Sequence, residues 1–196
     1  MMKNSVQIVL FFEKNEIFNP SKIATLINEQ IEEIGSPIIL PMGAPEEANI
    51  PILVFSQNNK INLTANFNNV SITLEDDMIE KSETLVTKIF DIFEENKYVR
   101  IGTIINKVLN KETISNIKEE TNCNETVLEA KDFKIAWLQE IDLANVKINM
   151  WKNYFSDKSN TENILCVYDF NTKPEDNIEV TKEFAIKFLE ECKNNI

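Results

Sequence analysis

The stretch Ile61-Asn-Leu-Thr-Ala-Asn-Phe-Asn-Asn-Val-Ser-Ile-Thr-Leu74 contains the clearest fold signal in this chain. Its apolar residues alternate with Asn, Ser and Thr on both sides of Asn68-Asn69, a pair that tolerates the positive φ of a tight turn. The pattern predicts an antiparallel hairpin with a two-residue loop, in which Phe67 pairs with Val70 on one face of the sheet. One face of that sheet should be apolar, and the other should be polar but largely uncharged.

The same alternation recurs outside this stretch and predicts a second hairpin, with strands from Phe133 to Ile141 and from Val146 to Phe155. Shorter apolar runs predict five more strands: Ser5 to Phe12, Ile38 to Leu40, Ile50 to Phe55, Tyr98 to Ile105, and Ile164 to Phe170. Hairpins therefore dominate the sheet, and most of its strands should be antiparallel.

Helical spacing of apolar residues predicts three to four helices. The first begins at Pro20 after the capping residue Asn19 and ends at Gly35. The others run from Asp76-Asp77 to near Asn96, from Asn110 to Asn122, and from Glu179 to Lys193. The class is α+β: a mostly antiparallel sheet with helices packed against it. We expect a single domain over residues 1–196. The halves, about 1–96 and 97–196, each hold a meander followed by a helix, so a pseudo-duplication is a hypothesis.

Composition excludes several kinds of active site. The 196 residues include no His, one Arg and three Gly. Without His there is no Ser-His or Cys-His nucleophile pair and no His metal ligand. The scarce glycines spell neither a Walker loop nor a dinucleotide fingerprint. We therefore expect no enzyme, no cofactor and no resident metal.

The formal net charge of -12 bears on the choice of partner. Binding to nucleic acid or to an anionic membrane depends on clustered Lys and Arg, whereas the lysines here are interspersed with acids. A basic protein is the partner that this charge favours, and a homo-oligomer stays open. Excess acid that only keeps the protein soluble is the alternative. The apolar run from Val6 to Phe12 is too short for a membrane span, and Glu13 follows it, so we expect a cytoplasmic protein.

Arg100 is the candidate with the most specific chemistry, because a guanidinium can hold a carboxylate or phosphate with two hydrogen bonds. Alternation along the strand would place Tyr98, Arg100 and Gly102 on one face. The interpretation that we favour is an internal ion pair with one of the 32 acids.

Other candidate contact residues are aromatic or acidic. Trp151 is out of phase with its apolar neighbours, which favours its exposure, together with Tyr154, as an interface anchor. A Trp151 partly covered under the last helix is the equally weighted alternative. Glu46 and Glu47 lie in a Pro-containing loop for which a binding role and a simple long hairpin connection are both open. Asp169 and Asn171 follow a strand, where an acidic turn that leads into the last helix is favoured over a cation site. Adjacent acids such as Asp76-Asp77 supply oxygen ligands for Mg²⁺ or Ca²⁺, but solvated surface acids explain them more simply.

The segment Arg100-Ile-Gly-Thr-Ile-Ile-Asn106 resembles the Arg-x-Gly strand motif of a sporadically distributed, uncharacterised bacterial family of α+β proteins. The strand that ends near Asp169 and the Phe-rich helix after it are also similar to that family. The chain departs from the pattern at Thr103 and Ile104, where the family has a second Arg. The resemblance implies an α+β fold and no particular activity.

The leading functional hypothesis is a non-enzymatic, acidic protein-binding module. A Lys-, Asn- and Ile-rich chain suggests an AT-rich bacterial or phage genome, and small acidic proteins of mobile elements resemble inhibitors that occupy nucleic-acid-handling host proteins. Two alternatives stay open. One is a carboxylate- or metal-dependent enzyme or small-ligand carrier, and the other is a structural or assembly subunit that pairs through sheet edges.

Overall fold

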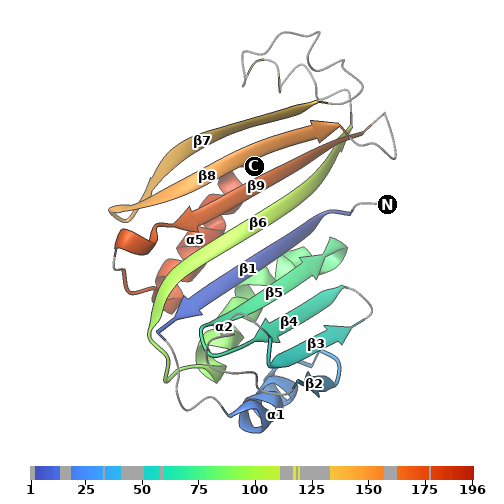
Figure 1. The fold of residues 1–196 in the computed structure, drawn as a ribbon, viewed down its shortest axis with the longest axis vertical. Coiled ribbons are helices and arrows are strands. Elements are labelled where there is room, and N and C mark those ends of the chain that lie inside the picture. Colours follow the sequence, from blue (N-terminus) through green and yellow to red (C-terminus); the bar gives the residue numbers. More distant parts are fainter. Residues whose placement is uncertain are drawn as a thin grey trace.

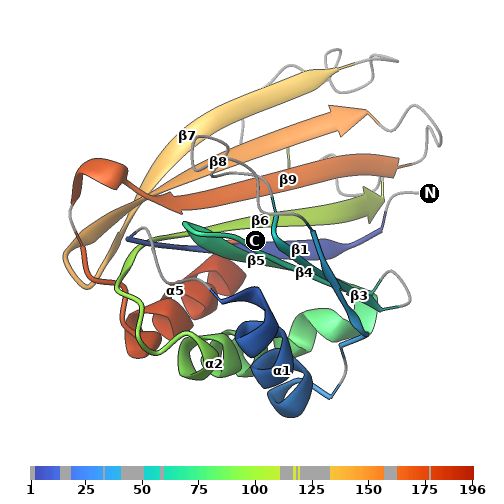
Figure 2. The same ribbon diagram turned by 60° about the horizontal axis from the view of Figure 1, so that its bottom comes forward.

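The computed structural model describes residues 3–13, 19–32, 34–40, 51–57, 60–110, 117, 119, 133–156, 163–176 and 178–196. Their strands form one sheet of nine, in the order β2-β3-β4-β5-β1-β6-β9-β8-β7, and every neighbouring pair is antiparallel. The helices α1, α2 and α5 lie behind this sheet in Figure 1 and below it in Figure 2. The predicted α+β class, with a mostly antiparallel sheet, is confirmed.

The strands have the following bounds: β1 Ser5–Phe12, β2 Pro37–Ile39, β3 Leu53–Gln57, β4 Ile61–Ala65, β5 Asn69–Glu75, β6 Tyr98–Asn110, β7 Lys134–Leu143, β8 Val146–Ser156 and β9 Asn163–Thr172. The α-helices are α1 Pro20–Gln30, α2 Ser82–Ile92 and α5 Lys182–Asn194, with short 3₁₀ helices η2 Asp76–Lys81 and η4 Pro174–Asp176. The third helix predicted from Asn110 to Asn122 falls almost entirely outside the described residues.

The described parts of the two halves follow a similar path through the sheet, although the first half has the helix α1 after β1 and one more strand in its meander. In the first half, β1 is followed by a meander whose last strand, β5, returns to pair with β1, and α2 comes next. In the second half, β6 is followed by the meander β7-β8-β9, β9 returns to pair with β6, and α5 comes next. The two first strands, β1 and β6, meet at the centre of the sheet (Figure 1).

The core lies between the sheet and the helices. Alternate residues of β1, from Val6 to Phe12, are at most 4% exposed, and they face the apolar stripes of α2 and α5. Ile89 and Phe188, one from each of these helices, are completely buried. This face accounts for most of the apolar burial that stabilises the fold.

The first hairpin differs from its predicted register. Ala65 pairs with Val70, rather than Phe67 with Val70, so the loop is longer than two residues. The cause is Asn66, only 3% exposed, whose side chain accepts hydrogen bonds from the N–H groups of Asn68 and Asn69 at 2.8 and 3.0 Å. Because the register moves by two residues, the apolar side chains keep the face that the sequence predicted.

Helix ends also differ from the prediction. Asn19 caps α1 as expected, accepting from Lys22 N–H at 3.1 Å. The α-helix nevertheless ends at Gln30 rather than at Gly35, and the buried Ile31 and Ile34 follow it outside the helix. Burial of these isoleucines therefore comes from tertiary packing, and their helical spacing in the sequence extended the prediction too far.

Candidate functional site

We define the open face as the side of the sheet opposite α1, α2 and α5. The register places alternate side chains of the central and C-terminal strands on it, and the open-face residues used below are Phe11, Arg100, Gly102, Asp169, Asn171, Trp151, Phe155 and Leu138. The described residues place no helix over this face (Figures 1 and 2). Four of the predicted contact residues lie on this surface: Arg100, Asp169, Asn171 and Trp151.

Arg100 connects three strands across the open face. Its guanidinium carbon lies 4.5 Å from the centroid of the Phe11 ring on β1, a cation–π geometry. An Nη atom donates to Asn171 Oδ1 on β9 at 3.4 Å, and Asn171 Nδ2 in turn donates to Asp169 Oδ1. These contacts order four side chains in one row.

The favoured interpretation of Arg100, an internal ion pair, is wrong for the described part of the chain. No carboxylate there lies within ion-pair distance of its guanidinium, and its buried Nε atom has no hydrogen-bond partner. The Phe11 ring and the Asn171 amide hold the Arg100 guanidinium in place, and neither of them neutralises its positive charge. The guanidinium is thus free to bind an external acceptor.

Gly102 makes this row of side chains feasible. A Cβ at this position would lie 2.5 Å from Asn171 Oδ1, closer than atoms of real structures approach. A larger residue at this position would therefore have to displace the Asn171 side chain from its contact with Arg100. This gives a structural reason for glycine two residues after arginine in this strand.

Trp151 continues the row on β8, because it is the cross-strand partner of Asp169. Its side chain is 43% exposed, as the sequence predicted. On the next strand, β7, its partner is Leu138, which is 46% exposed. Sequence reasoning had not selected Leu138, Phe155 or Phe11, although alternation from the buried residues of each strand would have assigned all three to this face.

Two predicted contact residues lie on the other side of the sheet. Tyr154 is only 2% exposed, so its expected exposure beside Trp151 is wrong. Residues three apart in a strand point to opposite faces, and Tyr154 stacks instead on Trp137 with ring centroids 5.5 Å apart. Its hydroxyl lies 3.5 Å from that of Tyr168.

Tyr98 does not share a face with Arg100, because a bulge interrupts the alternation. Phe11 pairs with Arg100, but the next residue, Phe12, pairs with Tyr98, so that Val99 is an extra residue. Tyr98 is consequently 4% exposed and packs against Phe90 and Phe12. Burial raises the pKa of its hydroxyl far above the ordinary value of a tyrosine.

The remaining predicted residues have mixed outcomes. Asp169 and Asn171 belong to β9, which continues to Thr172, so the turn expected over Asp169 to Asp176 begins only after that strand, with η4 at Pro174–Asp176. Glu46 and Glu47 lie outside the described residues. The structure therefore brings together four of the predicted residues, Arg100, Asp169, Asn171 and Trp151.

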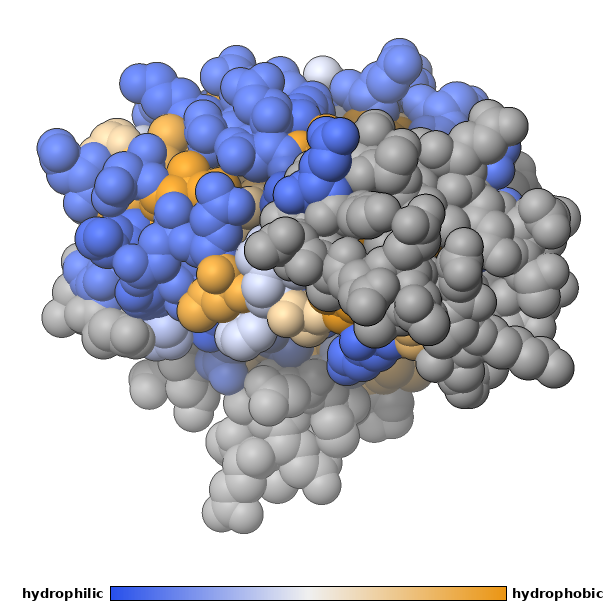
Figure 3. All heavy atoms as spheres, turned by 90° about the horizontal axis from the view of Figure 1, so that it is seen from above, coloured by the Kyte–Doolittle hydropathy of each residue, from blue (hydrophilic) through white to orange (hydrophobic). Residues whose placement is uncertain are grey.

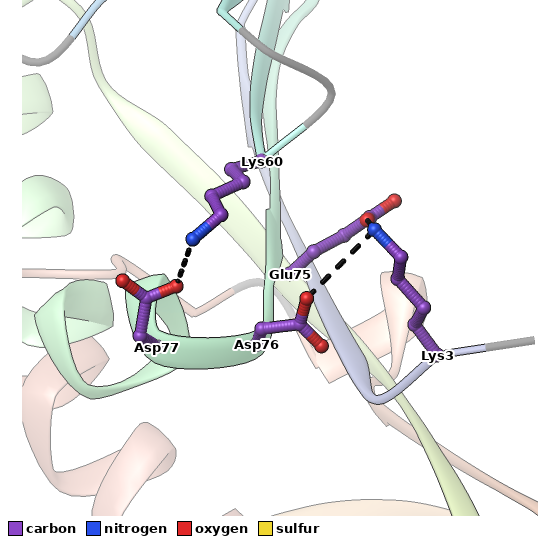
Figure 4. A network of polar contacts seen from close by, with 5 residues as sticks. All are labelled: Lys3, Lys60, Glu75, Asp76 and Asp77. Atoms are coloured by element: carbon purple, nitrogen blue, oxygen red, sulfur yellow. Dashed lines mark hydrogen bonds and ion pairs between the residues drawn. The ribbon is translucent and has the colours of Figure 1, made fainter.

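The adjacent acids Asp76-Asp77, together with Glu75 before them, pair with lysines. Figure 4 shows Lys60 paired with Asp77 at 2.6 Å, and Lys3 between Glu75 and Asp76 at 3.1 and 3.8 Å. The hydrogen bond from Lys60 holds the pKa of Asp77 below its ordinary value. Within the described ranges, no group of three or more Cys, Asp or Glu side chains is arranged to hold a metal ion.

A separate pocket of about 140 Å³ lies on the helix side of the sheet. Its walls come from β1, β6, η2 and α5 and are mostly apolar, with Val6, Ile105 and Leu189 among them. Thr103 also lines it, and the buried Oγ1 atom of Thr103 has no partner among the described residues. The Cys192 thiol, a further lining group, has a raised pKa because it is buried.

No protein-family model matches this chain, and no curated protein matches it either. Among the described helices, none combines the length and the apolar character needed to cross a membrane. Any functional conclusion therefore depends on the open face and on the distribution of charge.

Proposed function

We propose that this chain is a non-enzymatic protein-binding module that binds a basic protein through its open face, with Trp151 as the anchor. The observation that carries the proposal is the exposure of Trp151 on β8, the second strand from the β7 edge, directly opposite the exposed Leu138 and on the same face as the half-buried Phe155. Large aromatic side chains at the centre of a contact surface supply most of the binding energy in many protein complexes.

The charge distribution supports a basic partner. The nine strands carry four acidic and five basic side chains, so the sheet itself is close to neutral. The excess negative charge of the chain is therefore carried by the helices and connecting segments. Such a field speeds the encounter with a basic surface, while the neutral open face avoids the cost of desolvating many charges on contact.

Arg100 adds specificity to this surface. The guanidinium is held over Phe11 and beside Asn171 without a carboxylate partner. It is therefore positioned to donate hydrogen bonds to a carboxylate of the bound protein. Lysine would lack both the planar stack and the second hydrogen bond. Among basic partners, nucleic-acid-handling host proteins are the class that an acidic inhibitor from a mobile element would occupy.

The test is capture of partners from the lysate of a low-GC bacterium on the immobilised chain at low salt, followed by a salt gradient and mass spectrometry. A matched pair of variants gives the control: Trp151→Ala removes the anchor, whereas Ile38→Ala removes a hydrophobic side chain that is 59% exposed at the far end of the sheet. We expect one basic protein to be retained by the wild type and by Ile38→Ala, and to be released by moderate salt.

The purified partner then provides the quantitative readout. Trp151→Ala should weaken its affinity about thirty-fold, which corresponds to the loss of about 2 kcal/mol at an anchor residue. The wild-type chain should also displace DNA or RNA from this partner. Equal binding by both alanine variants, or retention of no basic protein above the level of an unrelated acidic control, would contradict the proposal.

A further inference from the structure

Among the described strands, β7 forms one edge of the sheet and has no strand on its outer side. Its ten residues pair with β8 along their whole length, and the sheet order ends there. At the opposite end, β2 has only three residues and begins with Pro37, which lacks an N–H donor. Of the two edges, only β7 offers a long row of backbone groups to another strand.

The turn between β7 and β8 determines which backbone groups face outward. Ala144 and Asn145 have φ values of 49° and 66°, as in a two-residue type I′ turn, and Leu143 pairs with Val146 directly beside it. In such a hairpin the residues next to the turn form a hydrogen-bonded pair, and the pattern alternates from there. The odd-numbered residues of β7 therefore bond to β8. The N–H and C=O groups of the even-numbered residues, 134 to 142, point away from it.

A second copy of the same edge fits these outward groups in one register. When Leu138 lies opposite Leu138 of a second copy in antiparallel orientation, all five outward-facing residues form hydrogen-bonded pairs. Lys134 then faces Asp142 at both ends, and Ala136 faces Glu140. On the helix side Ile135 faces Ile141. A shift by two residues in either direction takes Leu138 off the axis and separates Lys134 from Asp142 at both ends. In one of these shifts Lys134 faces Glu140 instead, a carboxylate that already pairs with Lys147 and Lys173.

The charges and exposures of the single chain agree with this register. Among the described residues, neither Lys134 nor Asp142 forms an ion pair, and the Lys134 ammonium lies 5.3 Å from the Phe155 ring instead. Leu138, which is 46% exposed, would become covered at the axis. Glu140 already pairs with Lys147 and Lys173, and the register places an alanine rather than another acid opposite it.

We propose that β7 pairs with β7 of a second copy in this register, and that the chain forms a two-fold dimer with one continuous sheet. Because paired residues share a face, both helix layers lie on one side and both open faces on the other. Where Figure 3 colours the surface on the β7 side, it is mostly hydrophilic with smaller hydrophobic areas, so backbone hydrogen bonds and the two ion pairs direct the association. This inference is independent of the proposed partner.

Charge reversal tests the register. Sedimentation equilibrium should show a dimer for the wild type, and Lys134→Asp or Asp142→Lys alone should raise the dissociation constant about ten-fold, because two attractive cross-strand pairs become repulsive. The double variant Lys134→Asp with Asp142→Lys should return to the wild-type value. Lys22→Asp on α1, with the same change of charge as Lys134→Asp, is the control and should leave the dimer unchanged.

Hydrogen exchange gives a second readout that does not depend on substitutions. The amides of Ala136, Leu138 and Glu140 should become more protected as protein concentration rises, because only the dimer bonds them. A wild-type chain that stays monomeric at several hundred micromolar would overturn the proposal. So would a folded double variant that associates as weakly as the single ones, or amides at the β7 edge whose exchange is independent of concentration.

Discussion

Two buried threonines on neighbouring strands should respond to the same substitution with opposite signs. Thr103 on β6 is 1% exposed, and its Oγ1 atom has no hydrogen-bond partner among the described residues. A buried hydroxyl without a partner costs about 1–3 kcal/mol, and valine keeps the β-branched shape that suits a strand. Thr103→Val should therefore raise the free energy of unfolding by about 1 kcal/mol.

Thr172 on β9 is equally buried, but its hydroxyl forms two hydrogen bonds. Its Oγ1 atom accepts from the Ile101 N–H at 3.1 Å and donates to the Ile101 C=O at 3.2 Å. The β6–β9 ladder ends one pair earlier, at Gly102 and Asn171, so this side chain replaces the missing backbone partner. Thr172→Val would leave two buried backbone groups without partners, and it should lower the free energy of unfolding by about 2 kcal/mol.

Urea denaturation of the wild type and both variants, with the m-value checked for constancy, measures the contrast. Because each variant exchanges one hydroxyl for one methyl group at a buried position, the gain from apolar transfer is similar, and the difference in sign isolates the hydrogen bonding. A loss of stability in Thr103→Val would refute the reasoning, since it would mean that this hydroxyl is satisfied. Equal changes in the two variants would refute it as well.

Two further predictions concern the open face and the buried thiols. Gly102→Ala should lower the free energy of unfolding by about 1–2 kcal/mol, because its Cβ displaces Asn171. A double-mutant denaturation cycle should show a smaller loss of stability in an Asn171→Ala background. An unchanged loss would contradict this coupling. In a Cys123→Ser background, Cys166 and Cys192 should react with a disulfide reagent only after unfolding. Both thiols are buried, and burial raises the pKa of Cys192. Rapid labelling of either thiol in the folded protein would contradict this prediction.

The alternation of apolar and polar residues predicted the correct face of the sheet for some side chains and the wrong face for others. It correctly predicted that Trp151 is exposed, and it placed the apolar residues of the first hairpin on the buried face even though the register was wrong. It failed at Tyr98, because the bulge at Val99 depends on how β1 and β6 pair, and these strands are nearly ninety residues apart in the chain. It was not applied consistently to Tyr154, whose odd spacing from Trp151 already indicated the opposite face.

Local patterns in the sequence determined the elements of this protein: antiparallel hairpins with one apolar face, a capped first helix and a near absence of catalytic side chains. These properties depend on residues that are close neighbours in the chain. The tertiary structure alone decided that Phe11, Arg100, Asn171 and Asp169 form one row, because it brings together three strands from distant parts of the chain. It also decided that β7 is an edge among the described strands, since strand order is set by which apolar faces share the helices, and no local pattern encodes that choice.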